Sequence, residues 1–441
     1  MVSVVDMSGA LPRAPLRWPS LFRLPFCLIH FTKSFNVLAI PRRCGIKSDG
    51  SADLLGIPVA DKLPGIFGIV ELQVIRIMKV SALSPALLGL VASTHAAAVA
   101  SSIQYSTVTG YFLQDETATD ASTFDYTAVN FGLINRTYPA DAVLKHQGKD
   151  LSQWERFYHQ VQKLNTDSDK DVEYKVLFLG RHGEGYHNAA ETYYGTPAWN
   201  CYWAELDGNG TSTWHDAALT ANGVNQALIA HNFWQKQIDE QNIHTPDNYF
   251  TSPLTRSLQT ANYTFNGLNL PHNAAKFRPL VKELFREGVS IHTCDHRRSK
   301  SYIKDLFPGW PIEKGFTEDD ELWNGVTAET SGAQDARSAT ALGEVFFAKS
   351  TKQEAFVSVT SHSGEISSIL RVLGHRSFSL KTGAVIPVLV KAEKVKGATS
   401  TTTAVSWTDS PHCTVPPVTS VTACVCPSSA APVTTPLVTD V

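Results

Sequence analysis

Arginine and histidine side chains follow apolar segments of this chain at the points where those segments end. The first such segment, residues 174–179, is followed by Arg181, His182 and Gly183. An imidazole that is neutral near pH 7 can act as a nitrogen nucleophile. A guanidinium presents a planar set of donors that matches the oxygens of a phosphate. This group of residues therefore indicates chemistry on a phosphoryl group, provided that further cationic partners exist.

Three later segments supply such partners. Arg256, Glu287 and His362 each follow an apolar run that is typical of a buried strand. The carboxyl ends of parallel strands are where an open α/β sheet binds its ligand, so we predict that these side chains converge. The strands predicted here cover residues 248–251, 279–285 and 355–360.

Helices and a closing strand complete the predicted α/β domain. Residues 152–163 carry an apolar face at helical spacing, and Thr220 is a plausible N-cap for a helix that runs to about residue 241. Residues 384–390 read as a last strand, and Pro387 predicts that this strand lies at an edge of the sheet. The aromatic side chains of the connection 189–218 are interpreted as packing that insertion rather than lining a pocket.

Composition bounds the class of protein. The chain has 441 residues, 43% hydrophobic and 18% charged, which suits one large globular domain or two ordinary ones. The formal net charge of -3 provides no electrostatic argument for a nucleic-acid partner or an anionic membrane. Arg23 and Lys33 interrupt the apolar stretch 18–40, so we expect no membrane span there.

A secretory leader is predicted inside the chain. Met78 and Lys79 precede an apolar segment and an Ala-x-Ala site, which is the layout of a signal peptide over residues 78–100. Our hypothesis is that translation starts at Met78, that residues 1–77 are a non-native upstream extension, and that the mature protein is extracellular. The alternative is an apolar helix within a longer N-terminal region. Three glycosylation sequons, at Asn135, Asn209 and Asn262, agree with secretion.

The hypothesis of secretion also sets the expected redox state of the cysteines, and composition sets the expectation for the C-terminal region. Five of the seven cysteines lie after the leader and would meet an oxidising environment, although their pairing cannot be deduced and one of five must stay unpaired or pair between chains. Residues 101–170 are predicted to be an ordered lead-in that packs on the domain 171–393. Residues 394–441 are rich in Ser, Thr and Pro and are predicted to form a disordered tail.

Taken together, the strand-end residues and their surroundings resemble the histidine phosphatase superfamily, also called the phosphoglycerate mutase-like family. The motifs are RHGEGYHN from Arg181, LTANGVNQA from Leu219, SPLTR ending at Arg256, and SHSGEI around His362. The resemblance covers about residues 174–391. It is closest to the branch of mutases and small phosphatases, because the phytase-type branch has a basic residue and a proline where this chain has Glu184 and Gly185. It implies a three-layer α/β/α fold with a mostly parallel central sheet.

The resemblance also implies roles for individual residues. His182 would attack the phosphoryl group, while Arg181, Arg256 and His362 would hold its oxygens. Glu287 would protonate the leaving oxygen, with Glu283 as the competing choice. We prefer Glu287 because it lies just past the predicted strand rather than within it. The remaining residues predicted to contact substrate are Asn188, Glu184, Arg297 and Arg298, the last two either recognising acidic groups or forming a solvated loop.

The implied activity is metal-independent hydrolysis of a small phosphorylated substrate by a secreted, acid phosphatase-like phosphomonoesterase. No cofactor and no metal are expected, because the arginines and the second histidine provide the positive field that stabilises a transferring phosphoryl group. One alternative is a mutase that moves phosphate within a sugar acid. Another is a catalytically silent binding protein with the same fold, since fold alone does not determine function. Neither the substrate nor the oligomeric state follows from the sequence.

Overall fold

The protein is described here from a computed structural model. The structure describes residues 101–142, 150–347, 352–397, 406–418, 425–427 and 432–438. The predicted upstream extension 1–77 and the leader 78–100 lie outside these residues. Within the described residues, no helix is both long enough and apolar enough to cross a membrane.

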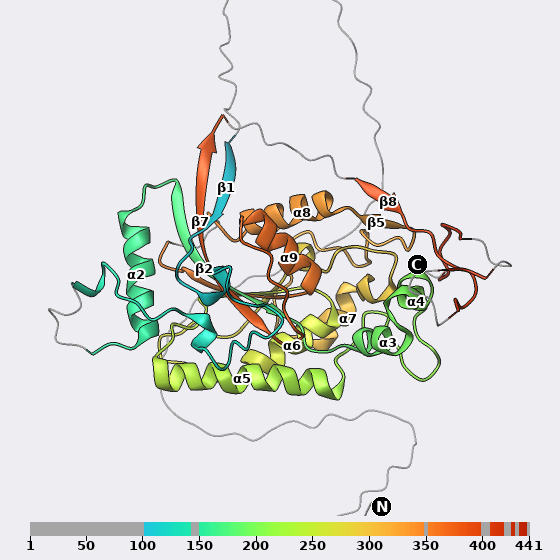
Figure 1. The fold of residues 1–441 in the computed structure, drawn as a ribbon, viewed down its shortest axis with the longest axis horizontal. Coiled ribbons are helices and arrows are strands. Elements are labelled where there is room, and N and C mark those ends of the chain that lie inside the picture. Colours follow the sequence, from blue (N-terminus) through green and yellow to red (C-terminus); the bar gives the residue numbers. More distant parts are fainter. Residues whose placement is uncertain are drawn as a thin grey trace, which may run out of the picture. The chain divides into compact units, whose positions relative to one another are not determined.

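A mixed sheet forms the centre of the described domain. Its six strands lie in the order β1-β7-β2-β6-β3-β4. The strands β2, β6, β3 and β4 run parallel, and β7 is antiparallel to both β1 and β2. The predicted α/β fold with a mostly parallel central sheet is therefore confirmed (Figure 1). The strands are β1 (Ser101–Thr107), β2 (Val172–Arg181), β3 (Asn248–Thr251), β4 (Leu280–Val281), β6 (Phe356–Ser361) and β7 (Val385–Lys396).

Helices cover both faces of this sheet because its strands are apolar on both faces. Along β2, Val176 and Phe178 belong to one buried cluster, whereas Leu177 and Leu179 belong to a second. Successive side chains of a strand point to opposite faces, so the two clusters lie on opposite sides of the sheet. The first cluster packs α2 (Gln153–Asp167), α5 (Ala221–Gln241) and α6 (Thr255–Phe265), and the second packs α8 (Ser331–Gly343) and α9 (Ser363–Val372).

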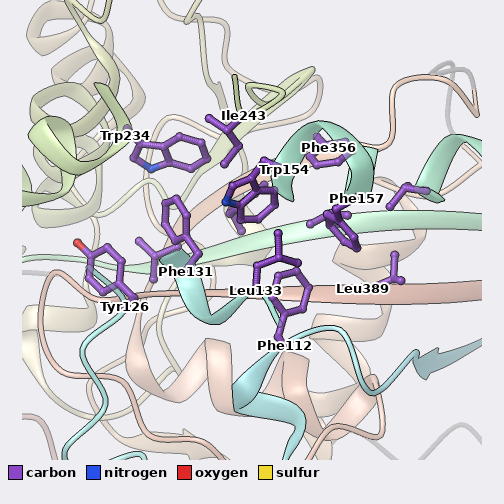
Figure 2. Packing of buried hydrophobic residues seen from close by; sticks show 14 of the residues in the cluster. Phe112, Tyr126, Phe131, Leu133, Trp154, Phe157, Trp234, Ile243, Phe356 and Leu389 are labelled. Carbon is purple, nitrogen blue, oxygen red and sulfur yellow. The ribbon is translucent and has the colours of Figure 1, made fainter. Parts of the chain in front are cut away.

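Aromatic rings dominate the first cluster, which contains residues of the lead-in as well as of the domain (Figure 2). Phe131 lies 4.9 Å from Trp234 of α5 between ring centroids, and Phe178 lies at the same distance from the same indole. Trp154 of α2 is fully buried against both phenylalanines. Residues 101–142 and α2 are therefore part of the core, and truncating Trp154 to Ala would cost about 3–5 kcal/mol.

The predicted third strand is wrong for most of its length. Only Leu280 and Val281 form β4, and residues Glu283–Phe285 form a 3-10 helix. The partner strand β3 ends at Thr251, which pairs with Val281, so no ladder continues beyond that point. The chain then turns, and the ammonium of Lys282 donates to Glu313 at 2.6 Å instead of lying along a sheet.

The prediction that Pro387 marks an edge strand is also wrong, because β7 lies between β1 and β2. Leu389 accepts a hydrogen bond from the backbone of Val108, so its polar groups face the β1 side. Pro387 lies two residues earlier and faces the same side, beyond the point where β1 ends at Thr107. Its missing N–H therefore removes no ladder hydrogen bond.

The described part of the C-terminal region is ordered, contrary to the predicted disordered tail. Strand β7 continues to Lys396, and β8 (Trp407–Asp409) pairs antiparallel with β5 (Thr327–Glu329). Cys413 is fully buried, bonded to Cys426, and its backbone N–H donates to Cys201 at 2.8 Å. Cys201 is itself disulfide-bonded, and Cys294 is a free buried thiol. These long-range partners, which composition does not reveal, order the segment.

The connection 189–218 folds into short helices around its own aromatic side chains. These are α3 (Tyr186–Tyr194), α4 (Thr196–Cys201) and a 3-10 helix at Trp203–Glu205. Trp199 and Trp214 are buried 5.5 Å apart in a separate small cluster. The interpretation that these aromatics pack the insertion holds for Trp199 and Trp214, whereas Tyr193 is 81% exposed.

Candidate active site

The predicted residues converge at the carboxyl edge of the parallel strands. Arg181 is the last residue of β2, and it pairs in register with Ser361, the last residue of β6. His182 and His362 follow directly, and their rings lie 5.0 Å apart between centroids. Arg256 reaches the same point from the first turn of α6, where its Nε–H donates to His362 Nδ1 at 3.2 Å. The parallel register therefore brings together residues that are far apart in the chain.

Backbone contacts determine which nitrogen of His182 is reactive. Its Nδ1 lies 2.6 Å from the carbonyl oxygen of Gly183, and an oxygen of this kind can only accept. The proton of the neutral ring is therefore on Nδ1, and Nε2 keeps its lone pair. Burial, Arg256 and Arg181 hold the pKa of His182 well below its usual value. A neutral imidazole with a free Nε2 lone pair can act as a nucleophile.

His362 has a different set of contacts. Arg256 donates to Nδ1, while the hydroxyls of Ser252 and Ser257 lie 2.7 Å and 3.2 Å from Nε2. Burial, Arg256 and His182 hold the pKa of His362 well below its usual value. Both nitrogens are therefore occupied in the described site, and a direct bond from His362 to a phosphate would replace one of these contacts.

Arg256 is fixed by residues that the sequence analysis did not select. Its guanidinium donates to the carbonyl of Cys294 at 2.6 Å and forms an ion pair with Asp295 at 3.3 Å. Potential metal-ligating atoms of His292, Cys294 and Asp295 lie within 4.8 Å of one another. The carboxylate of Asp295 already pairs with Arg256 and accepts a hydrogen bond from Ser290 at 2.6 Å. We therefore interpret this group of residues as positioning Arg256 rather than as a metal site.

Comparison with known proteins agrees with this geometry. A family model described as the histidine phosphatase superfamily, branch 1, matches residues 177–385. A protein named probable phosphoglycerate mutase from Arthroderma benhamiae is 50% identical over 297 residues, which cover 67% of this chain and 87% of that protein. The chain belongs to the histidine phosphatase superfamily. This histidine phosphatase is also 34% identical to a probable phosphoglycerate mutase of Saccharomyces cerevisiae, over 59% of this chain and 90% of that one. A phosphomutase-like protein of Candida albicans is 41% identical over 50% of this chain and 66% of its own length.

The two glutamates that competed for the role of acid occupy different environments. Glu283 forms ion pairs with Arg286 at 3.1 Å and with Arg297 at 2.7 Å. The carboxylate of Glu287 instead accepts from the backbone N–H groups of Gly364 at 3.2 Å and of Glu365 at 3.0 Å, at the start of α9. Burial, with the charge of Asp295, raises the pKa of Glu287. Burial also raises the pKa of Glu283, so the pKa does not distinguish the two carboxyl groups. The two arginines that pair with Glu283 hold its carboxylate, whereas no arginine or lysine among the described residues forms an ion pair with Glu287, which favours Glu287 as the acid.

Arg181 and Asn188 lie where the sequence predicted them, at the end of β2 and in the first turn of α3. One terminal nitrogen of Arg181 donates to the carbonyl of Leu380 at 2.7 Å, while its buried Nε has no acceptor within the described part of the chain. Asn188 accepts from the backbone of Gly185 at 3.0 Å, which leaves its amide nitrogen as a donor. Both residues therefore retain donors for a phosphate.

Glu184 holds residues 182–185, the loop that carries His182 and is called the nucleophile loop below, against α5. Its two carboxylate oxygens accept from Thr220 at 2.6 Å and from Asn222 at 3.1 Å. Thr220 caps the helix as predicted, by accepting from the backbone of Gly223 at 3.1 Å. The structure thus assigns Glu184 to the loop–helix junction rather than to contact with substrate.

The prediction that Arg297 binds substrate is wrong. Arg297 is 2% exposed, and its guanidinium donates to Glu283 and to several backbone carbonyls, including that of Asp319 at 2.7 Å. All of its N–H groups donate to these protein acceptors, so none remains for a ligand. The neighbouring Arg298 differs, because its Nε is buried without a partner among the described residues and its guanidinium lies 5.5 Å from the Tyr302 ring. Arg298 remains a predicted substrate contact.

Proposed function

We propose that this histidine phosphatase is a secreted phosphomonoesterase that forms a phosphohistidine on His182. The observation that carries the proposal is the bond from His182 Nδ1 to the Gly183 carbonyl at 2.6 Å, which leaves Nε2 as a nucleophile among three cationic or imidazole side chains. These are Arg181, Arg256 and His362. The proposed substrate is a small phosphate ester, and the chemistry described below uses no metal.

The reaction proceeds in two displacements. His182 Nε2 attacks phosphorus, the bond from phosphorus to the ester oxygen breaks, and Glu287 gives its proton to that oxygen so that an alcohol leaves. Water then attacks the phosphohistidine, Glu287 takes the proton from the water, and inorganic phosphate leaves with His182 restored. Arg181 and Arg256 stabilise the charge that spreads over the phosphoryl oxygens in both steps.

The directions of two pKa shifts are those expected of an acid phosphatase. His182 must be unprotonated, and its lowered pKa satisfies this condition even in mild acid. Glu287 must be protonated for the first step, and its raised pKa satisfies this condition up to a pH above the usual range of a carboxyl group. The first step is therefore fastest on the acidic side of neutrality and slows as the pH rises through the pKa of Glu287.

Secretion is proposed from the leader pattern at residues 78–100 and is supported by two further observations. The sequon asparagines Asn135 and Asn209 are exposed, and Cys413 is bonded to Cys426, as expected for a glycoprotein in an oxidising compartment. The N-terminus of the secreted protein should lie near Ser101. A mature protein that begins before Met78 would contradict the proposed leader.

The decisive experiment compares the full chain with His182→Ala, using an aryl phosphate and trapping of the phosphoenzyme. Hydrolysis and labelling that are both lost in the variant support the proposal, whereas labelling retained at full stoichiometry refutes His182 as the nucleophile. A mutase is the second candidate, because two relatives are named probable phosphoglycerate mutases. A phosphorylated sugar acid that is isomerised faster than it releases inorganic phosphate would establish the mutase. Absence of both activities, with substrate binding retained, would indicate the silent binding protein.

A further inference from the structure

A third histidine contacts the nucleophile and has no role in the mechanism above. His187 lies in the first turn of α3, and its ring centroid is 5.3 Å from that of His182 at an interplanar angle of 51°. Its side chain is 8% exposed. The residue belongs to the same RHGEGYHN motif as His182, so the loop that positions the nucleophile also positions this imidazole.

Nδ1 of His187 has no protein partner, unlike Nδ1 of its two histidine neighbours. This nitrogen is buried, and no described residue forms a hydrogen bond with it. By contrast, Nδ1 of His182 is bonded to a carbonyl, and both nitrogens of His362 are bonded. A buried polar group without a partner costs roughly 1–3 kcal/mol, so the unpartnered Nδ1 shows that no protein hydrogen bond explains why an imidazole lies at this position.

The position of Gly185 indicates which nitrogen carries the proton. A Cβ atom built on Gly185 would lie 2.6 Å from His187 Nδ1, so the glycine directs a hydrogen atom toward that nitrogen. A lone pair tolerates this hydrogen, whereas an N–H would oppose it. The favoured neutral ring therefore has its proton on Nε2.

The surrounding charges keep this ring neutral. Burial lowers the pKa of His187 well below its usual value, and the arginines Arg256 and Arg181 and the imidazoles of His182 and His292 add to the effect. These are the charged and titratable groups that act on the ring from β2, α6 and the segment after β4. A second proton on His187 is therefore disfavoured, and the ring can offer one donor.

We propose that His187 is a phosphate-binding residue of this histidine phosphatase that donates a hydrogen bond from Nε2 to an oxygen of the phosphoryl group. The inference rests on the proposed function, because the ligand is the phosphate of the same site. His187 thereby supplies the imidazole donor that His362 cannot supply while Arg256 and the two serines occupy its nitrogens.

The test uses amide side chains that imitate one nitrogen each. Glutamine places an N–H near the position of Nε2, asparagine places one near Nδ1, and phenylalanine retains the ring shape without a donor. We would measure the binding of inorganic phosphate to the full chain by calorimetry and kcat/KM for an aryl phosphate. Losing a bond to a charged group should weaken phosphate binding roughly 10–100-fold in His187→Phe and His187→Asn. His187→Gln should restore binding to within about threefold of the wild type.

The pH dependence separates a donor from a structural role. Because the neutral ring is the donor, the ratio of wild-type to His187→Phe phosphate affinity should stay constant between about pH 6 and about pH 8. A ratio that declines with rising pH would show a protonated ring and overturn the assignment. Equal phosphate affinity in the wild type and His187→Phe, or rescue by Asn rather than Gln, would also overturn it. Urea unfolding midpoints establish that all variants are folded.

The outcomes also separate this inference from the proposed function. If the full chain hydrolyses no phosphate ester but binds inorganic phosphate, and His187→Phe loses that binding, the proposed function fails and His187 remains a phosphate ligand. If the chain hydrolyses aryl phosphate and His187→Phe retains wild-type affinity and kcat/KM, the inference about His187 fails alone.

Discussion

Two glycines from different motifs are pressed against each other, and replacing one of them tests how the nucleophile is positioned. A Cβ on Gly183 would lie 2.3 Å from the carbonyl oxygen of Gly223, and a Cβ on Gly223 would lie 2.0 Å from that of Glu184. The obstructing atoms are backbone, so no flexible side chain can move aside. The nucleophile loop and the first turn of α5 therefore approach as closely as they do only because both residues lack a side chain.

Because of this contact, the sign of the change in the free energy of unfolding caused by Gly223→Ala is informative. Within a helix, alanine is favoured over glycine by roughly 1 kcal/mol, so propensity alone predicts a more stable protein. Overpacking against rigid surroundings costs about 1–3 kcal/mol or more, and a Cβ at 2.0 Å cannot be accommodated without moving the loop. We expect the free energy of unfolding to fall by about 1–3 kcal/mol. We expect kcat/KM to fall on the order of 100-fold, because a displacement of about 1 Å at the reacting atoms costs that much.

The matched control is Gly343→Ala at the end of α8. A Cβ there would meet Ile103 and Tyr105 at 3.8 Å, which is ordinary van der Waals contact. This variant should keep full activity and gain up to about 1 kcal/mol of stability. Urea unfolding and steady-state kinetics on an aryl phosphate provide both measurements. If Gly223→Ala is as active as the wild type and more stable, the close approach of loop and helix does not position His182.

Three further perturbations test other parts of the site and the C-terminal contacts. A Cβ on Gly364 would lie 2.3 Å from Glu287 Oε1, so Gly364→Ala should reduce turnover roughly 10²–10⁴-fold for esters with poor leaving groups and much less for aryl esters. An equal loss across a series of leaving groups would argue against displacement of an acid. Glu287→Gln should remove the decline of activity at alkaline pH, because the wild-type decline follows the raised pKa of that carboxyl; a decline that persists belongs to another group. Glu205 lies 2.7 Å from Nδ1 of His412 in the C-terminal region, and burial raises the pKa of this carboxyl from 4.5 to about 9. Its contribution to stability is therefore fully present below pH 4.5 and is lost as the pH rises toward 9. Glu205→Gln should flatten that dependence in thermal unfolding, and an unchanged slope would place the titration elsewhere.

The sequence predicted correctly that Arg181, His182, Arg256 and His362 converge, because their positions depend on strand ends. Arg181 and His362 follow long apolar runs, and parallel strands in register place their ends together whatever lies between them. The same reasoning failed for residues 279–285, where the apolar pattern was right but the partner strand was too short to extend the ladder. It also failed for Pro387, because the length of β1 on that side cannot be known from β7.

Sequence alone does not predict the hydrogen-bond partners of charged and polar side chains. Arg297 and Arg298 are adjacent and identical in type. Arg297 is buried and donates to the backbone carbonyls of Thr317 and Asp319, whereas Nε of Arg298 has no partner among the described residues. Only the tertiary positions of the acceptors distinguish them. His187 was visible in the motif, but its lack of partners became apparent only when every neighbouring donor and acceptor had been placed.

The position of β2 in the sheet has a consequence for the order in which the chain can fold during synthesis. This strand carries the nucleophile at its end and pairs only with β6 and β7 among the described strands, both of which are made much later. Residues 182–355 separate β2 from β6, and a ribosome needs on the order of 10–35 s to add them at roughly 5–20 residues per second. During that interval a strand whose residues 176–179 are all apolar has no strand partner. Until β6 and β7 emerge, this apolar segment has no strand partner and is a point where aggregation can begin. A chain that ends before β6 would lack both strand partners of the segment that leads into His182.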